Sequence, residues 1–189
     1  MNAQETALWW ARLRSGGPQQ VAPGVPSPGA AGGVRRLVEP DGGAIWLVPV
    51  VPETSGPAVL AELGLPALTA EQPNDTARVL AAVLRCCWPD PAAALWPGVP
   101  ASFAAVASVL RGMVDRDPAA FHRACVGAIR RLDVARWVLW DESARVVRLG
   151  PRVAQWTPAD LTVLRQLYRA MPAPAADAVV VLPEDGDGE

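Results

Sequence analysis

The stretch that begins at Pro118 repeats apolar side chains at the spacing of a helix. Residues 121, 124, 125, 128, 129 and 132 are apolar and lie three or four positions apart, so a helix places them on one face. Asp117 can cap the first free amides, and Pro118 fits a first turn, where its missing N–H would have no partner. The opposite face carries His122, Arg123, Val126, Gly127 and Arg130. The pattern therefore predicts an amphipathic helix that begins at Pro118.

After Asp133 the pattern changes to two short runs of β-branched and aromatic residues. These runs cover residues 137–140 and 145–149, and the polar residues 141–144 separate them. Such runs are typical of strands, and a short polar connection is typical of a hairpin. We therefore expect a two-stranded hairpin here.

A second helix is expected after the hairpin. Thr157 supplies a capping hydroxyl, Pro158 a first-turn proline and Asp160 a first-turn carboxylate. Apolar residues then recur at helical spacing as far as Met171, and Pro172 ends the run.

Two further amphipathic patterns precede Pro118. Asn74 caps a run with apolar residues at 79, 80, 83, 84 and 87, and Ser102 caps another with apolar residues at 106, 109, 110 and 113. The stretch 89–100 between them contains several prolines and reads as a loop. Counted from Asn74, the order is helix, helix, helix, hairpin, helix.

In this order and in its hydrophobic pattern, roughly residues 74–171 resemble the winged-helix superfamily. The resemblance covers about half of the chain and contains no diagnostic motif. It implies an α+β fold in which the third helix is the recognition element, the hairpin is the wing and a C-terminal helix follows. It also implies a contact surface for DNA or a protein partner, formed by His122, Arg123, Val126 and Arg130 on the helix and by Arg145 and Arg148 on the wing.

The first 72 residues are expected to hold smaller elements. Residues 1–15 can form a short helix, and residues 16–33 are so rich in glycine and proline that a flexible linker is expected. Residues 34–72 are expected to form an additional β-hairpin around the turn at 40–43, followed by a short helix near 57–63. Pro49 and Pro52 should end the second strand or confine it to a sheet edge.

The remaining boundaries follow from the same pattern. Residues 73–171 are expected to form the winged-helix-like domain, and residues 172–189 are expected to form an acidic tail. Within the tail, the apolar run 178–182 could either add an edge strand or stay disordered.

Composition excludes several classes of protein. The chain has 189 residues, and its 17 basic residues are all arginine. Without lysine there can be no P-loop ATPase, Schiff-base enzyme or pyridoxal enzyme, because each of these needs an amine. The bias towards alanine, proline and glycine is typical of a GC-rich bacterial genome. No apolar run is long enough to span a bilayer and the amino end lacks a signal pattern, so a cytoplasmic location is expected.

Residues that could carry catalysis are scarce. His122 is the only histidine, and it lies on the outward helix face with no nucleophile in a recognisable motif nearby. Cys125 lies three residues on but lacks the further ligands that a zinc site needs, and the adjacent Cys86 and Cys87 read as free, buried thiols. We therefore expect no enzyme, no bound metal and no cofactor.

Charge and tryptophan are unevenly distributed. Residues 1–110 carry 6 arginines and 8 acids, residues 111–169 carry 11 arginines and 6 acids, and residues 170–189 carry 5 acids and no arginine. Most of the eight tryptophans should pack the hairpin onto the helices, since indoles bury a large area. Trp9, Trp10 and Trp88 lie in less regular segments and, if exposed, would anchor a protein partner.

The functional expectation is a non-enzymatic accessory or regulatory module. The leading interpretation is an assembly subunit that uses its winged helix to join a larger protein complex, in outline similar to the small winged-helix subunits that attach to chromosome-organising ATPases. The alternative is a DNA-binding transcriptional regulator that uses the arginine-bearing helix and wing. The first is preferred because Asp141 and Glu142 at the wing tip would repel phosphates, and the helix lacks the amide and hydroxyl side chains that read bases.

Overall fold

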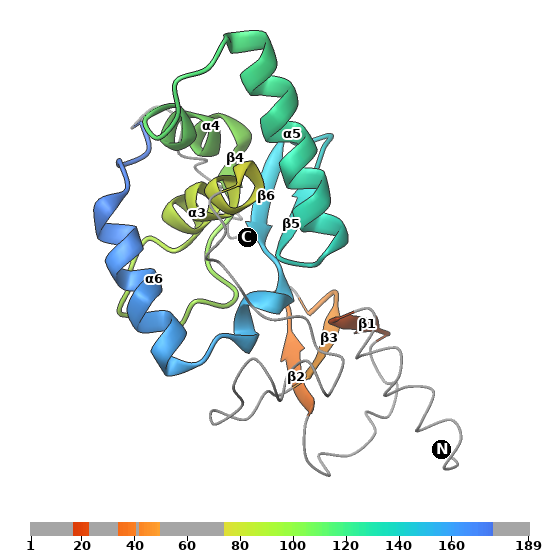
Figure 1. Cartoon of the computed structure of the whole chain (residues 1–189). Coiled ribbons are helices and arrows are strands. Elements are labelled where there is room, and N and C mark those ends of the chain that lie inside the picture. The colour runs from red at the N-terminus through yellow and green to blue at the C-terminus, as the bar shows by residue number, and fades with distance from the viewer. Residues whose placement is uncertain (1–16, 23–33, 41, 50–73, 176–189) are drawn as a thin grey trace, which may run out of the picture.

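The computed structural model describes residues 17–22, 34–40, 42–49 and 74–175. In these ranges the chain is an α+β protein with four α-helices, one short 3-10 helix and two small antiparallel sheets. Figure 1 shows the helices gathered around one sheet, with the other sheet at the base of the molecule. No helix within the described ranges is long and apolar enough to cross a bilayer.

Each α-helix begins directly after a side chain that caps it. Asn74, Ser102 and Asp117 each accept a hydrogen bond from the amide three residues on, and Thr157 forms a reciprocal capping box with Asp160. The sequence therefore sets the start of every one of these helices. They are α3 (Asp75–Cys87), α4 (Phe103–Arg111), α5 (Pro118–Val134) and α6 (Pro158–Ala170).

The expected hairpin after α5 forms, and it belongs to a three-stranded sheet. Its strands are β5 (Val138–Asp141) and β6 (Val146–Leu149). A two-residue strand, β4 (Ala101–Ser102), pairs with the other edge of β6, which gives the order β4-β6-β5. Because β4 runs directly into α4, it ties the start of that helix to the hairpin.

The second sheet has the order β1-β3-β2. Its central strand β3 (Ile45–Pro49) is buried throughout and pairs antiparallel with β2 (Val34–Val38) and β1 (Gln19–Val21). Pro49 ends β3, where only β2 lies alongside it. The rest of the expected 16–33 linker, the expected helices in 1–15 and 57–63, and the 178–182 run lie outside the described residues.

The segment expected to be a flexible linker thus contains a strand. Gln19–Val21 forms β1 because β3 offers it a free edge, and its pairing runs from Gln19 opposite Leu47 to Val21 opposite Ile45. Local composition predicted a flexible linker because glycine and proline surround these three residues. The strand was not predicted because its partner β3 lies more than twenty residues further along the chain.

The main core lies between the helices and the inner face of the hairpin. Val138, Val147 and Leu149 on the hairpin are all at most 1% exposed and pack against the buried faces of α3, α4 and α5. Five of the six predicted inward positions of α5 are buried, namely Phe121, Cys125, Ala128, Ile129 and Leu132, and the sixth, Ala124, is half-buried. The hairpin therefore buries one face and leaves the other for further contacts.

The β1-β3-β2 sheet joins this body next to the 3-10 helix η1 (Pro151–Gln155). Arg35 donates to the carbonyl of Ala154 at 3.2 Å, and the Gln155 side chain donates to the carbonyl of Pro49 at 3.3 Å. These bonds hold the sheet close to the base of the hairpin, which positions the site described next.

Candidate functional site

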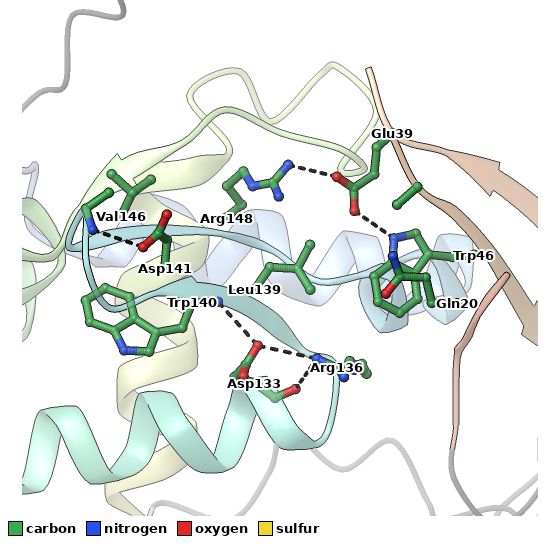
Figure 2. A pocket seen from close by; sticks show the side chains of 12 residues that line it. Gln20, Glu39, Trp46, Asp133, Arg136, Leu139, Trp140, Asp141, Val146 and Arg148 are labelled. Atoms are coloured by element: carbon green, nitrogen blue, oxygen red, sulfur yellow. Dashed lines mark hydrogen bonds and ion pairs between the residues drawn. The ribbon is translucent and has the colours of Figure 1, made fainter. Parts of the chain in front are cut away.

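A cleft of about 550 Å³ lies between the β1-β3-β2 sheet and the outer face of the β5-β6 hairpin. Figure 2 shows the hairpin along one wall, the sheet at one end and the end of α5 below. The cleft falls within the size range of small-ligand sites, and it is open to solvent. It is lined by Gln20, Glu39, Ala44, Trp46, Asp133, Arg136, Leu139, Trp140, Asp141, Ala144, Val146 and Arg148.

The register of the hairpin sets the pattern of side chains on its outer face. Leu139 pairs with Arg148, and Asp141 pairs with Val146. Each cross-strand pair thus has one apolar and one charged member, and the two charges lie on opposite strands and at opposite ends of the face. All four side chains line the cleft.

A buried carboxylate connects the sheet to the hairpin. Glu39 is only 6% exposed, yet one of its oxygens accepts from the Trp46 indole N–H at 2.7 Å and the other from Arg148 Nη1 at 3.0 Å. A buried charge is costly unless it is paired and hydrogen-bonded, and both conditions hold here. Arg148 itself is 43% exposed, so its guanidinium group also faces the cleft.

Arg136 also lines the end of the cleft that lies nearest the sheet. Its guanidinium group lies 5.6 Å from the centre of the Trp46 ring and donates to the main-chain carbonyl of Asp133 at 3.4 Å. The Asp133 carboxylate pairs with it at 3.6 Å and also accepts from the Trp140 amide. Each of the two arginines in the cleft therefore has a carboxylate partner.

Asp141 marks the other end of the cleft, beside the hairpin turn. Its Oδ1 accepts from the Ala144 amide at 2.9 Å and from the Ser143 hydroxyl at 2.6 Å. The Ala144 bond first, then the Ser143 bond, hold the pKa of Asp141 below its usual range, and nearby Arg148 adds to the effect. The exposed carboxylate is thus ionised at neutral pH, and both of these hydrogen bonds leave its Oδ2 open to the cleft.

The six residues predicted to form the contact surface do not form one cluster. The prediction is wrong for Val126, which is half-buried and packs against the core instead of facing outward. Arg148 lies in the cleft, and His122 and Arg123 are exposed on α5. His122 meets the Phe103 ring edge-on at 5.4 Å, and Arg123 has no hydrogen bond or ion pair within the described residues. Arg130 is paired with Glu142 at 2.5 Å, and Arg145 lies 4.8 Å from the centre of the Phe103 ring.

The prediction that Trp88 could anchor a partner is wrong. Trp88 is 2% exposed and packs in the core, where its indole donates to the Ala93 carbonyl and its ring meets Tyr168 edge-on, so it is not available to a partner. It is buried because the loop after α3 folds back over it, a tertiary effect that local pattern does not show. Trp9 and Trp10 lie outside the described residues.

Sequence reasoning identified Arg148 but missed Glu39, Trp46 and Gln20, which face it. These three come from a part of the chain more than ninety residues away, so no local motif joins them to the hairpin. The only local signal was Glu39 itself, a lone acid beside a predicted turn between two apolar runs.

The described part of the chain has neither a cluster of metal-binding side chains nor a thiol with a lowered pKa. It contains no group of three or more histidine, cysteine or acidic side chains that could hold a metal ion. Burial raises the pKa of Cys86 to about 12 and that of Cys125 to about 11, and it raises the pKa of Cys87 as well. All three are free thiols, and at neutral pH they are protonated and poor nucleophiles.

Comparison with known proteins adds no further constraint. No protein-family model, curated protein or solved structure matches this chain.

Proposed function

We propose that residues 74–171 are a winged helix and that the chain acts by binding a protein partner, as a non-enzymatic subunit of a larger assembly. The order of α3, α4, α5, the β5-β6 hairpin and α6 agrees with this proposal. So does the packing of the hairpin's inner face on the helices, which leaves its outer face and the exposed side of α5 for contact.

The proposal rests on one observation: three arginines of this surface already have partners within the chain. Arg130 is paired with Glu142, Arg148 with Glu39, and Arg145 lies over Phe103. Phosphate contacts would have to compete with these partners, and the turn presents Asp141 and Glu142 besides. A surface with charges of both signs next to apolar and aromatic groups is typical of protein interfaces.

DNA binding is the second candidate, because one part of the surface does favour it. Arg123 is exposed and unpaired within the described residues, His122 lies beside it, and residues 111–169 carry a net charge of +5, from 11 arginines and 6 acids. A phosphate could bind here without displacing an internal partner.

Affinity capture of the chain from its own organism distinguishes the two candidates. We expect one protein to co-purify at about 0.3 M salt, where long-range attraction is screened to a few ångströms. An Arg123→Glu variant should lose this protein. The matched control is Arg169→Glu, an exposed arginine in the last turn of α6, which should retain it.

The contrary result is equally specific. A chain recovered without any protein, which binds a short DNA duplex at low salt and loses that affinity by about three orders of magnitude at moderate salt, would replace the assembly role with DNA binding. Recovery with neither partner would contradict both candidates.

A further inference from the structure

We propose that the cleft binds an extended polypeptide segment of the partner, with an acidic side chain and a basic side chain two residues apart. The inference rests on the protein-binding function proposed above and names the chemistry of the segment that is bound.

The spacing comes from the hairpin. Arg148 and Asp141 belong to pairs two residues apart along the strands, and strands advance by about 3.3 to 3.4 Å per residue, so these pairs lie about 7 Å apart. An extended segment has the same rise, and its side chains at i and i+2 point to the same side. An acid at i and a base at i+2 therefore match Arg148 and Asp141.

Both charged groups have bonding capacity left for such a ligand. Within the described residues, Arg148 donates through Nη1 to Glu39, and Asp141 accepts from the turn through Oδ1. The remaining guanidinium N–H groups and the Asp141 Oδ2 can make charge-assisted hydrogen bonds. Leu139 and Val146 provide apolar contact between them.

The charge of the lining selects a polypeptide over a nucleic acid. Three carboxylates, on Glu39, Asp133 and Asp141, line the cleft beside the two arginines. A single partner carboxylate can approach Arg148, but a phosphate backbone would meet these three negative charges as well.

Binding of two synthetic, fluorescently labelled octapeptides to the full chain tests the proposal. The first has a glutamate and an arginine separated by one valine, and the second has the same composition with the two charged residues adjacent, so that their side chains point to opposite sides. We expect the first to bind about tenfold more tightly, because only it can place both charges against Arg148 and Asp141 at once. Equal affinity for the two peptides would overturn the proposal.

Variants of Asp141 locate the contact. Asp141→Asn keeps the oxygen that accepts from Ala144 but removes the charge, and it should weaken the first peptide by about five- to tenfold. Asp90→Asn is the matched control, because Asp90 also accepts a turn amide, that of Ala92, but lies outside the cleft lining; it should bind as the wild type does. Equal affinity in wild type and Asp141→Asn would contradict the proposal.

A charge exchange provides the decisive test. Asp141→Arg should no longer bind the first peptide but should bind a peptide in which the arginine is replaced by glutamate. Exchanging the two charges restores binding only if position 141 contacts that peptide side chain directly. A short DNA duplex that binds the wild type and displaces the first peptide would instead assign the cleft to nucleic acid. If the peptides fail while affinity capture still retains a protein partner, the cleft inference is wrong and the assembly role stands.

Discussion

Gly150 lies against the backbone of Arg136 at the point where β6 passes into η1. Its amide donates to the Trp137 carbonyl at 2.8 Å, and the Arg152 amide donates to the Arg136 carbonyl at 3.1 Å. A Cβ atom on Gly150 would lie 2.2 Å from the Arg136 carbonyl oxygen, which no relaxed structure allows. Arg136 itself has a φ of 62°, so this backbone has little freedom to move aside.

Gly150→Ala should therefore destabilise the fold by about 1 to 3 kcal/mol, the usual cost of overpacking. The control is Gly127→Ala in the middle of α5, where a Cβ meets nothing closer than 3.5 Å and alanine should add about 0.5 to 1 kcal/mol of stability. Urea denaturation of both variants measures these free energies of unfolding. A Gly150→Ala protein as stable as the wild type would contradict the close contact.

At the scale of elements, the sequence predicted the features that depend on near neighbours. The capping residues Asn74, Ser102, Asp117 and Thr157 mark the helix starts, because each cap acts within three residues. The sequence did not predict the strands β1 and β4, because they depend on residues far away along the chain. They have three and two residues, too few for a period, and they form only because a distant strand offers an edge.

The Glu39 contacts make the β1-β3-β2 sheet depend on the hairpin. Glu39→Ala removes the acceptor of the Trp46 indole and of Arg148, leaving a buried donor unpaired, and should destabilise the sheet's attachment by about 1 to 3 kcal/mol. Hydrogen exchange should accelerate in β3 while the buried amides of α5 keep their protection.

Glu142→Ala is the matched control for Glu39→Ala. It breaks the ion pair with Arg130. Both side chains of this pair are 59% exposed, and such surface pairs contribute little to stability. Unchanged exchange of β3 in the Glu39→Ala protein would show that this carboxylate does not hold the sheet.

At the scale of the whole molecule, the cleft exists only because two distant parts of the chain meet. Arg148 could be singled out from the sequence, since it alternates with buried residues on a predicted hairpin. The sequence did not predict that Glu39 and Trp46 form the other wall of the cleft, beside Arg148. Nothing in the local pattern indicates where the β1-β3-β2 sheet packs. The same docking explains why Arg148, expected to be free for contact, has an internal partner.

The central claim is that the chain works by binding a protein through the outer face of the hairpin and the exposed side of α5. Its most direct test is photo-crosslinking in the native organism from a benzophenone amino acid placed at Leu139 in the cleft, with Val163 on α6, a 64% exposed apolar position, as the control. We expect a discrete protein adduct from position 139 and none from position 163. A DNA adduct from position 139, or a protein adduct from position 163 alone, would contradict the claim.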